Sequence, residues 1–557
     1  MPATADTSTA RLNEDEPLVG GTGTALMTPK AMVEHRTHAN PRRDRTRARR
    51  LGWGLGLALG LASASLATDA NASGFATARF GGEHGHPITE NPTAIYYNPA
   101  GLALSKGTHV FVDGTMALRW ASYTRPGVAP GVVDSQTSLD LAPGANDGKA
   151  TLFNFVGAPF VGVSSDFGTD FIYAGGALYF PFGGQATWDQ NERFAGDPNF
   201  AGAVDGQQRW YTIVGSMRSM YLTGSVAFNI RRIGLSIGVS GSAIRSSVDT
   251  IRARNADGTD DLVSVRGDDL LLKEGRSRIN VNGWQGGFGI GLVYDIAKLG
   301  KYFLGASYTS QPNVAGGMSL EGELVNVLAT GLPSTTAVEL QQTLPDIFRF
   351  GIRVRPSEKY ELRLFGDFTR WSVFDKQCIL ELDEPNRNCD FRIYDGTPDG
   401  GDPGRGRNAA ALDDPTRFGG SGDPNDPNRP GDTRGVTQHL PRFWRNAGGV
   451  RFGASYWFIP AVEGFAGVGY DSTAVPLQTL DPALMDAHKM STSLGARWQV
   501  IRNLAFALTS TQIIFFRTST QGESALSQFQ SPTRQPSGNG VYRQFMQVFN
   551  VYADISF

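Results

Sequence analysis

The fold of this 557-residue chain is decided by the stretch Tyr360-Glu361-Leu362-Arg363-Leu364-Phe365-Gly366-Asp367-Phe368-Thr369. Its side chains alternate between apolar Leu362, Leu364 and Phe368 and charged Glu361, Arg363 and Asp367. A period of two predicts a β-strand with one apolar and one polar face. The stretch 450–458 repeats the pattern. A soluble sandwich gives the same local signal, so the spacing of the strands must decide between a sandwich and a barrel.

The connections between the predicted strands alternate strictly between short and long. The strands are expected near 108–124, 150–163, 170–184, 208–230, 232–254, 276–296, 301–323, 340–355, 359–375, 446–459, 464–474, 488–500, 503–519 and 540–557. Every second connection is a short turn, and the others are long, the longest being 376–445. Bacterial outer-membrane barrels are built in this way, with short periplasmic turns and long outer loops. We therefore predict an all-β, 14-stranded antiparallel transmembrane β-barrel with both ends in the periplasm.

The composition agrees with a membrane barrel. The formal net charge is −2, which gives no basic surface for nucleic acid. The mean hydropathy of −0.23 is that of a soluble protein, as expected where lumen-facing and lipid-facing residues alternate. The two cysteines, Cys378 and Cys389, lie within one polar stretch. A disulfide suits an oxidising compartment, and two free thiols are the alternative.

Residues 1–72 form an N-terminal extension and a predicted secretory signal peptide. Six arginines between Arg42 and Arg50 precede the apolar run Leu51 to Ala67, and Ala70-Asn71-Ala72 supplies the small residues of a cleavage site. We expect cleavage after Ala72; an uncleaved membrane anchor is the alternative. The 40-residue polar forerun leaves the translation start open between Met1 and an internal methionine.

Residues 73–106 lack the period of two and precede the barrel, predicted to span 107–557. Asn91-Pro92 and Asn98-Pro99 each place a capping side chain before proline, which predicts two short helical turns. Fourteen strands enclose a lumen wider than side chains alone can fill. We expect this segment to be a hatch inside the lumen, with Asn98, Pro99, Ala100 and Gly101 as its core.

The end of the chain adds a further signal. Phe549, Val551, Ala553, Ile555 and the terminal Phe557 share one face of the last strand. A final strand with a terminal aromatic residue resembles the recognition signal of outer-membrane barrels. It predicts insertion by the barrel assembly machinery into outer-membrane lipid and lipopolysaccharide, as a monomer.

Several motifs, in order along the chain, resemble the FadL family of outer-membrane transporters. They are Ser73-Gly74-Phe75, Asn98-Pro99-Ala100-Gly101-Leu102, Leu344-Pro345, Thr369-Arg370-Trp371-Ser372-Val373-Phe374 and Tyr470-Asp471-Ser472-Thr473-Ala474-Val475-Pro476. The family carries long-chain fatty acids and includes toluene and xylene carriers. The resemblance implies a hatch that blocks the lumen, capture of ligand among the outer loops, an internal pocket, and sideways exit at a kink in strand three. The 376–445 loop is far longer than the family pattern and is not explained by it.

Strand three contains the residue types that a kink requires. Gly175, Gly176 and Pro181 are the candidates, because proline cannot donate to the ladder and glycine permits a bulge or bend. The alternative is that Pro181 only ends the strand at the outer rim.

Two further sets of residues are candidates for ligand binding. The connection between strands seven and eight carries an apolar series at a spacing of three to four, which predicts a short amphipathic helix beside the first binding groove. That series comprises Leu320, Leu324, Val325, Val327, Leu328, Leu332 and Leu340; we single out Leu324, Val327, Leu328 and Leu332. Because side chains alternate between the two faces of a strand, five arginines are expected to face the lumen, where a guanidinium is able to bind a carboxylate. They are Arg119, Arg349, Arg353, Arg363 and Arg451. Packing between loops, and pairing with Asp113, Glu361 or Asp367, are the respective alternatives.

The function expected from the sequence is passive uptake of a hydrophobic small molecule across the outer membrane, without chemistry and without a cofactor. A general diffusion porin is the first alternative, and an outer-membrane enzyme or a structural surface protein are weaker ones. No histidine has a nucleophile motif beside it. Glu83, His84 and His86 make a poor metal set, and calcium binding by the acidic 395–433 stretch is the weaker alternative to a solvated loop. We therefore predict neither catalytic nor metal-binding residues.

Overall fold

The computed structural model describes residues 79–127, 142–266, 269–314, 317–328, 331–393, 418–419, 432–529 and 531–557. The chain divides into two units, Met1–Trp53 and Gly54–Phe557, and all described residues belong to the second. The predicted signal peptide and most of the 395–433 stretch lie outside the described residues.

Fourteen antiparallel strands close into a barrel, because β1 pairs with β2 on one side and with the last strand, β23, on the other. Nine of them are continuous: β1 (Thr108–Arg125), β2 (Gly148–Ser165), β3 (Ile172–Thr187), β4 (Val214–Ile230), β5 (Leu235–Arg254), β8 (Gly275–Asp295), β19 (Val462–Asp471), β20 (Lys489–Ile501) and β23 (Val541–Ser556). Five are interrupted: β9 and β10 (Tyr302–Thr309, Met318–Val327), β12 and β11 (Ile347–Ser357, Pro333–Gln342), β13 and β14 (Tyr360–Thr369, Lys376–Glu381), β18 and β17 (Ala447–Ile459, Val436–Pro441), and β21 and β22 (Leu504–Phe515, Thr518–Ser519). The predicted strand count and antiparallel order are confirmed.

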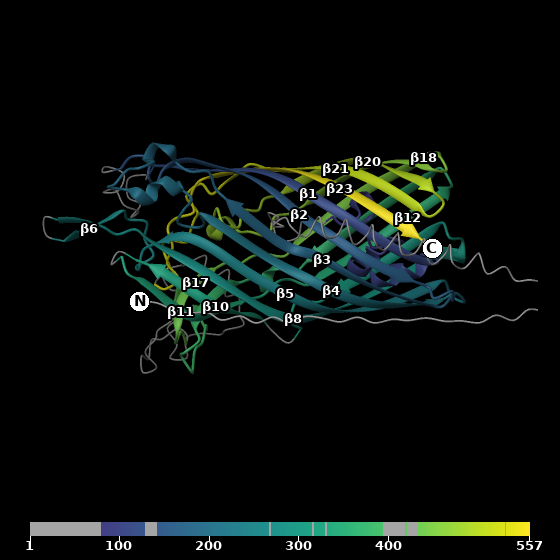
Figure 1. The fold of residues 1–557 in the computed structure, drawn as a ribbon, viewed down its shortest axis with the longest axis horizontal. Helices are drawn as coiled ribbons and strands as arrows, with labels where there is room; N and C mark the ends of the chain where they lie inside the picture. The colour runs from purple at the N-terminus through teal and green to yellow at the C-terminus, as the bar shows by residue number, and fades with distance from the viewer. Residues whose placement is uncertain are drawn as a thin grey trace, which may run out of the picture. The chain divides into compact units, whose positions relative to one another are not determined.

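The two ends of the barrel differ as the connection lengths predict. The turns between β2 and β3, β4 and β5, and β18 and β19 are short, and lie at the end of the barrel where Figure 1 labels β12, β18 and the C-terminus. The long connections emerge at the opposite end, near the labels β6 and β17 (Figure 1). They include two small two-stranded sheets, β6–β7 (Val263–Arg266, Asp269–Leu272) and β15–β16 (Arg392–Ile393, Phe418–Gly419). We call these the turn end and the loop end.

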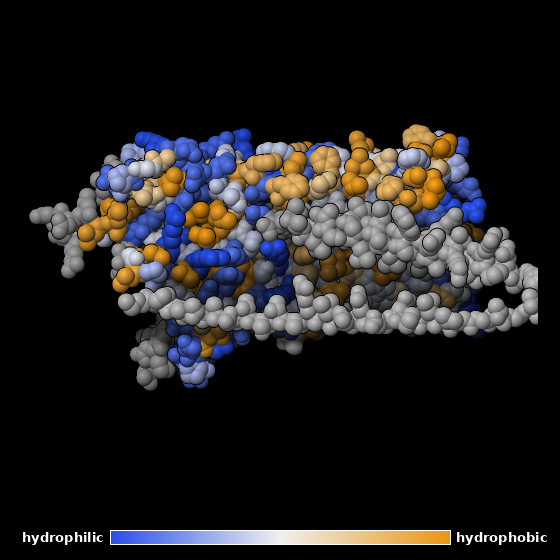
Figure 2. All heavy atoms as spheres, viewed as in Figure 1, coloured by the Kyte–Doolittle hydropathy of each residue, from blue (hydrophilic) through white to orange (hydrophobic). Residues whose placement is uncertain are grey.

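Strand alternation separates an apolar outer face from a polar inner face. On β12, Phe348, Phe350 and Ile352 are exposed, whereas Arg349, Gly351 and Arg353, which alternate with them, are buried inside the barrel. Figure 2 shows hydrophobic residues gathered over the wall around β1, β23 and β20, and hydrophilic residues at the loop end. The prediction that the arginines of this strand face the lumen and its large apolar residues face the lipid is confirmed. Among the described residues, no helix is both long enough and apolar enough to cross a bilayer.

Residues 79–106 lie inside the barrel; we call them the lumenal segment. They contain η1 (Gly82–His84), α2 (Ala94–Tyr97) and η2 (Pro99–Leu104). Asn98 caps η2 as predicted, since its side chain accepts a hydrogen bond from the Ala100 amide, and Pro99 occupies the first helical position. The Asn98 side-chain amide also donates to the Leu292 carbonyl of β8, at 3.0 Å, which ties the segment to the wall.

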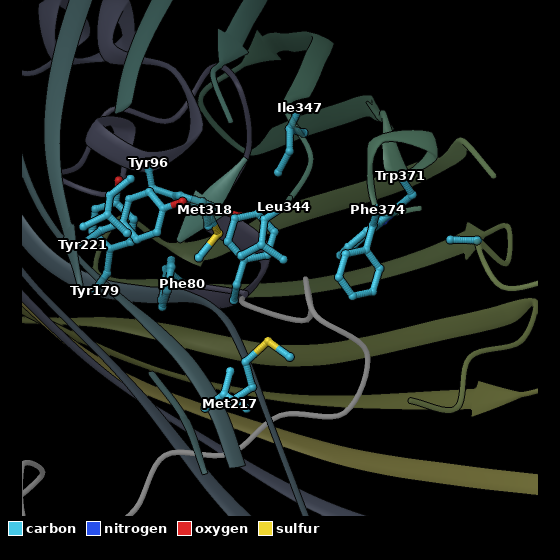
Figure 3. Packing of buried hydrophobic residues seen from close by; sticks show 14 of the residues in the cluster. Phe80, Tyr96, Tyr179, Met217, Tyr221, Met318, Leu344, Ile347, Trp371 and Phe374 are labelled. Atoms are coloured by element: carbon cyan, nitrogen blue, oxygen red, sulfur yellow. The ribbon is translucent and has the colours of Figure 1, made fainter. Parts of the chain in front are cut away.

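Glycines on the inner wall leave room for this segment. A Cβ at Gly238 or Gly291 would overlap Ala100 or Asn98, and one at Gly305 would lie 2.6 Å from Ile88. Aromatic residues complete the packing. Figure 3 shows Phe80 and Tyr96 of the segment among Tyr179 and Tyr221 of the wall, with ring centroids of Phe80 and Tyr96 5.2 Å apart.

The amphipathic helix predicted between strands seven and eight is wrong, because β10 and β11 continue as a paired hairpin from Met318 to Gln342. Leu320, Leu324 and Leu340 are buried on its inner face. The separation of four between Leu320 and Leu324 fits the period of two of a strand as well as the turn of a helix. Part of the long connection 376–445 is likewise strand, since β14 and β17 pair and extend the wall.

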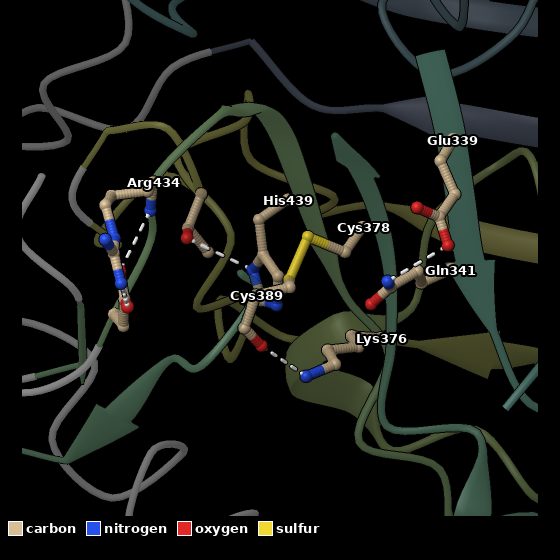
Figure 4. Close-up of a disulfide and its surroundings, with 9 residues drawn as sticks. Glu339, Gln341, Lys376, Cys378, Cys389, Arg434 and His439 are labelled. Atoms are coloured by element: carbon tan, nitrogen blue, oxygen red, sulfur yellow. Dashed lines mark hydrogen bonds and ion pairs between the residues drawn. A yellow bond between two sulfur atoms is a disulfide. The ribbon is translucent and has the colours of Figure 1, made fainter. Parts of the chain in front are cut away.

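The long connections pack together at the loop end. Tyr211, Phe391, Phe443 and Phe529, which come from three of the long connections, belong to one buried apolar cluster. Cys378 and Cys389 form the disulfide predicted as one alternative, and Lys376 donates to the Cys389 carbonyl at 2.6 Å (Figure 4). The disulfide therefore closes a short loop within the insertion, and both of its cysteines belong to the loop-end cluster.

Candidate functional site

A cavity of about 1090 Å³, part of it open to solvent, lies inside the barrel at the loop end. We call it the apolar cavity. Inward-facing residues of successive strands line it, among them Met217, Val248, Ile279, Leu324 and Leu340. Mostly apolar walls with a few polar groups are typical of a small-molecule binding site.

Three arginines and one aspartate also line the apolar cavity. Arg442 is paired with Asp481 at 2.6 Å. Arg119 is buried and binds only uncharged acceptors, donating to Gln544 Oε1 at 2.8 Å and to the Gln185 carbonyl at 3.2 Å. The cavity therefore carries more positive than negative charge.

Arg252 is the third cation of the apolar cavity. It lies near the end of β5, partly buried, and within the described part of the chain its side chain makes neither a hydrogen bond nor an ion pair. Partial burial of an uncompensated cation is unfavourable unless an anion joins it. This arrangement suits a ligand with an anionic group.

The apolar cavity reaches the barrel wall where β2 and β3 stop pairing. The ladder between them joins Phe160–Ser165 to Ala174–Tyr179 and goes no further, although β3 continues to Thr187. The pairing of β3 with β4 is also irregular between Tyr179 and Phe182. Pro181 lies in this irregularity and has no N–H to donate. We call β2 152–159 and β3 180–187 the unpaired seam.

Isolated hydrogen bonds replace the ladder at the unpaired seam and at its outer end. The amide of Thr187 donates to Asn154 Oδ1 at 3.4 Å, and that of Asp189 donates to the Thr151 carbonyl at 2.9 Å. Arg119 donates a hydrogen bond to the Gln185 carbonyl of β3. Gly183–Ala186 of the seam line the apolar cavity, so the cavity and the seam are continuous.

Two of the three predicted kink residues lie away from this break. Gly175 and Gly176 are paired with Ser164 and Val163 of β2 and with β4 on the other side. A Cβ at Gly175 would lie 3.1 Å from Ile95 of the lumenal segment. It would come closer still to the Val163 carbonyl oxygen of β2, at 2.6 Å. This glycine therefore leaves room for the neighbouring strand as well as for the lumenal segment, and the break begins beyond it.

A second cavity, of about 1110 Å³, lies between the lumenal segment and the wall. Arg349 and Arg451 line it, but acidic and basic residues occur there in equal number. Arg451 is paired with Asp367 at 2.5 Å and with Asp471, whereas Arg349 lies over the Tyr96 ring at 4.5 Å. Trp444 borders both this polar cavity and the apolar cavity, and packs against Trp371.

The remaining predicted arginines stabilise the protein itself. Arg353 donates to the Ile88 carbonyl and Glu90 of the lumenal segment, at 3.2 and 3.1 Å. Arg363 pairs with Glu361 and donates to Ser455. Asp113 pairs with none of the predicted arginines; it accepts hydrogen bonds from Gly81 and Asn550.

The polar residues of the lumenal segment also have protein partners. Glu83 accepts from Ser493, and His84 bonds Glu463 and Tyr552. His86 accepts from the Ile88 amide. Among the described residues, no group of three or more metal-ligating side chains is arranged to hold an ion.

The predicted ligand-binding apolar residues divide between two environments. Leu324 lines the apolar cavity. Val327 and Leu332 are exposed at the tip of the hairpin, and Leu328 is partly buried there.

Arg252 was missed by sequence reasoning because the outward face of β5 turns polar beyond Ala243, at Arg245, Ser247 and Asp249, so alternation no longer assigns faces. Arg442 and Asp481 lie outside the regular strand pattern, where parity gives no information.

Comparison with known families agrees with this geometry. The model of the family described as "Outer membrane protein transport protein (OMPP1/FadL/TodX)" matches residues 58–534. No curated protein matches the chain.

Solved structures of low sequence identity share the fold. A FadL homologue of Pseudomonas aeruginosa is 16% identical with a TM-score of 0.60, covering 88% of this chain and 100% of that one. The toluene transporter TbuX of Ralstonia pickettii is 14% identical with a TM-score of 0.52, covering 87% and 99%. The toluene transporter TodX of P. putida is 13% identical with a TM-score of 0.51, covering 88% and 99%.

Proposed function

This chain belongs to the FadL/TodX family of outer-membrane transport proteins for hydrophobic compounds, and from that premise we propose that its ligand is a long-chain amphiphile with a carboxylate head group. The ligand binds in the apolar cavity and leaves sideways through the unpaired seam. The observation that carries this proposal is the continuity of an apolar, net-positive cavity with the stretch of β3 that has no ladder partner on β2.

The apolar wall supplies the affinity for the alkyl chain, because burying each methylene contributes about 0.8 kcal/mol. The cations supply the preference for an anion. Arg119 and Arg252 face the cavity without a carboxylate partner within the described residues, and a guanidinium binds a carboxylate through two parallel hydrogen bonds.

Arg119 connects binding to exit. Its guanidinium bonds the Gln185 carbonyl, a β3 group in the stretch without a β2 partner. A carboxylate that binds Arg119 competes for the same donors and weakens this bridge across the seam. The ligand thereby loosens the wall at the place where it leaves.

The lumenal segment acts as the hatch that prevents free diffusion. It is buried and bonded to β8, β9 and β12 of the wall. A general diffusion porin requires an open lumen, and this segment occupies it.

A neutral aromatic hydrocarbon is the second candidate ligand, favoured by the apolar lining and by the toluene transporters TbuX and TodX with the same fold. Dodecanoate, dodecanol and toluene distinguish the two. They share an apolar part, and only dodecanoate carries the anion.

The test is equilibrium binding of these probes to the detergent-solubilised full chain. Replacing Arg252 by Gln removes a charge without breaking any described bond. We expect R252Q to lower dodecanoate affinity roughly tenfold or more, as for a lost charge-assisted hydrogen bond, and to leave dodecanol affinity unchanged. Arg193→Gln, at an exposed loop position, is the matched control. Equal affinity of R252Q and wild type for dodecanoate, or tight toluene binding alone, contradicts the proposal.

A further inference from the structure

A smaller cavity, of about 500 Å³, lies beside the apolar cavity at the loop end. Its walls come from the end of β5 with the residues that follow it, and from the segment Ser531–Pro536. Arg252 and Gln535 line both cavities, so the two adjoin. We call the smaller one the arginine chamber.

The arginine chamber is lined by three cations, Arg252, Arg254 and Arg534, and none of the described residues that line it is Asp or Glu. Arg254 donates to the Thr437 carbonyl at 3.0 Å. The side chains of Arg252 and Arg534 make no hydrogen bond or ion pair within the described ranges. The chamber is therefore more positive than the apolar cavity.

Acidic residues near the chamber are already engaged with other cations. Asp257 and Asp261 bind Lys273 at 2.6 and 2.9 Å, Asp260 binds Arg125, and Asp481 binds Arg442 at 2.6 Å. None of these carboxylates lines the chamber. The arginines there are not neutralised by their own loop.

A separate observation also indicates an anion. Gln535 is only 4% exposed, and its Nε2 has no hydrogen-bond partner. A buried donor without a partner is unfavourable, so such groups normally have an acceptor. Its position between the two cavities places that acceptor at their junction.

We propose that the arginine chamber is an outer head-group site, which binds the oxoanion of the transported amphiphile (a carboxylate or a phosphate) before its alkyl chain settles in the apolar cavity. The proposal rests on the proposed function, since it assumes that an amphiphile enters the apolar cavity. Arg534 and Arg254 bind the head group first, and Arg252, shared by both cavities, receives it next. The chamber thus selects anionic amphiphiles over neutral hydrocarbons at the entrance.

The test compares wild type with Arg534→Gln, because Arg534 makes no described bond whose loss would disturb the fold. Binding of dodecanoate, dodecanol and inorganic phosphate is measured on the detergent-solubilised full chain. We expect R534Q to weaken dodecanoate binding roughly tenfold, the equivalent of one charge-assisted hydrogen bond, and to leave dodecanol unchanged. Weak phosphate binding by wild type is expected to disappear in R534Q. Arg193→Gln is expected to behave as wild type.

Three results overturn the head-group site. They are unchanged dodecanoate affinity in R534Q, an equal loss for dodecanol, and phosphate binding as tight as that of dodecanoate, which would assign the chamber to free ions. Failure of wild type to bind either dodecanoate or dodecanol refutes the proposed function instead, and the phosphate comparison between wild type and R534Q still decides the chamber.

Discussion

Replacing Asn98 by Ala tests how the lumenal segment is held. The Asn98 side chain is fully buried and makes three hydrogen bonds: it accepts from the Ala100 amide, and donates to the carbonyls of Pro87 and Leu292. The first caps η2, the second closes the segment on itself, and the third joins it to β8. All three are lost in N98A.

The magnitude follows from these bonds. Each net hydrogen bond contributes about 1 kcal/mol, so three contribute about 3 kcal/mol. Because every 1.4 kcal/mol is a factor of ten, the seated state of the segment loses roughly 100-fold in population relative to the open state. The barrel strands do not depend on this side chain and are expected to keep their stability.

Hydrogen exchange measured by mass spectrometry is the assay. Peptides that cover residues 94–104 are expected to exchange roughly 100-fold faster in N98A, if exchange follows local opening. Asn503→Ala is the matched control, since its side chain donates to Ser556 at the turn end, outside the lumen. Unchanged protection of 94–104 in N98A would refute the account of how the segment is anchored.

Three further predictions concern separate parts of the chain. Pro181→Val restores an N–H to β3; we expect stronger protection of β3 in hydrogen exchange and slower dodecanoate uptake by cells, with binding unchanged. Cys378→Ser with Cys389→Ser opens a crosslink between residues 11 apart in sequence; the β14–β17 extension is expected to lose about 3 kcal/mol of local stability, seen as faster proteolysis there with an unaltered barrel melting temperature. Asp166 accepts hydrogen bonds from the amides of Gly107 and Gly168, which lower its pKa, so its contribution is present at neutral pH and lost as the pH falls below about 4. Asp166→Asn is therefore expected to be less stable than wild type at pH 7, with the difference vanishing in acid; a difference that persists at low pH would contradict this.

Much of the barrel follows from sequence because a transmembrane strand has only two environments. The alternation in β12 and β13 assigns Arg349, Arg353 and Arg363 to the lumen, and the structure buries all three. The Asn98-Pro99 cap is equally local, since one side chain and one fixed φ specify the start of η2.

Where two periods coincide, the sequence is ambiguous. Leu320 and Leu324 are four residues apart, which places them on one face of a helix and also on one face of a strand. Pairing with β8 and β14 decides for strand, and this pairing is long-range information.

The candidate site depends most on contacts between distant segments. Arg252 and Arg534 meet at one chamber although they are far apart along the chain, and only the fold shows that the described residues around them include no carboxylate that lines it. Pro181 signals an irregularity, but its place relative to β2 depends on the register between the strands.

Locking the unpaired seam tests the central claim most directly. Asn154→Cys and Ala186→Cys place thiols on opposite sides of it, in a background where Cys378 and Cys389 are serine, and a reversible thiol cross-linker joins them. A control pair, Thr223→Cys and Ser242→Cys, is joined in the same way across the regular β4–β5 ladder. We predict that the cross-linked seam still binds dodecanoate but stops its uptake until reductant is added, whereas the control transports throughout. Full uptake through the cross-linked seam would contradict the account.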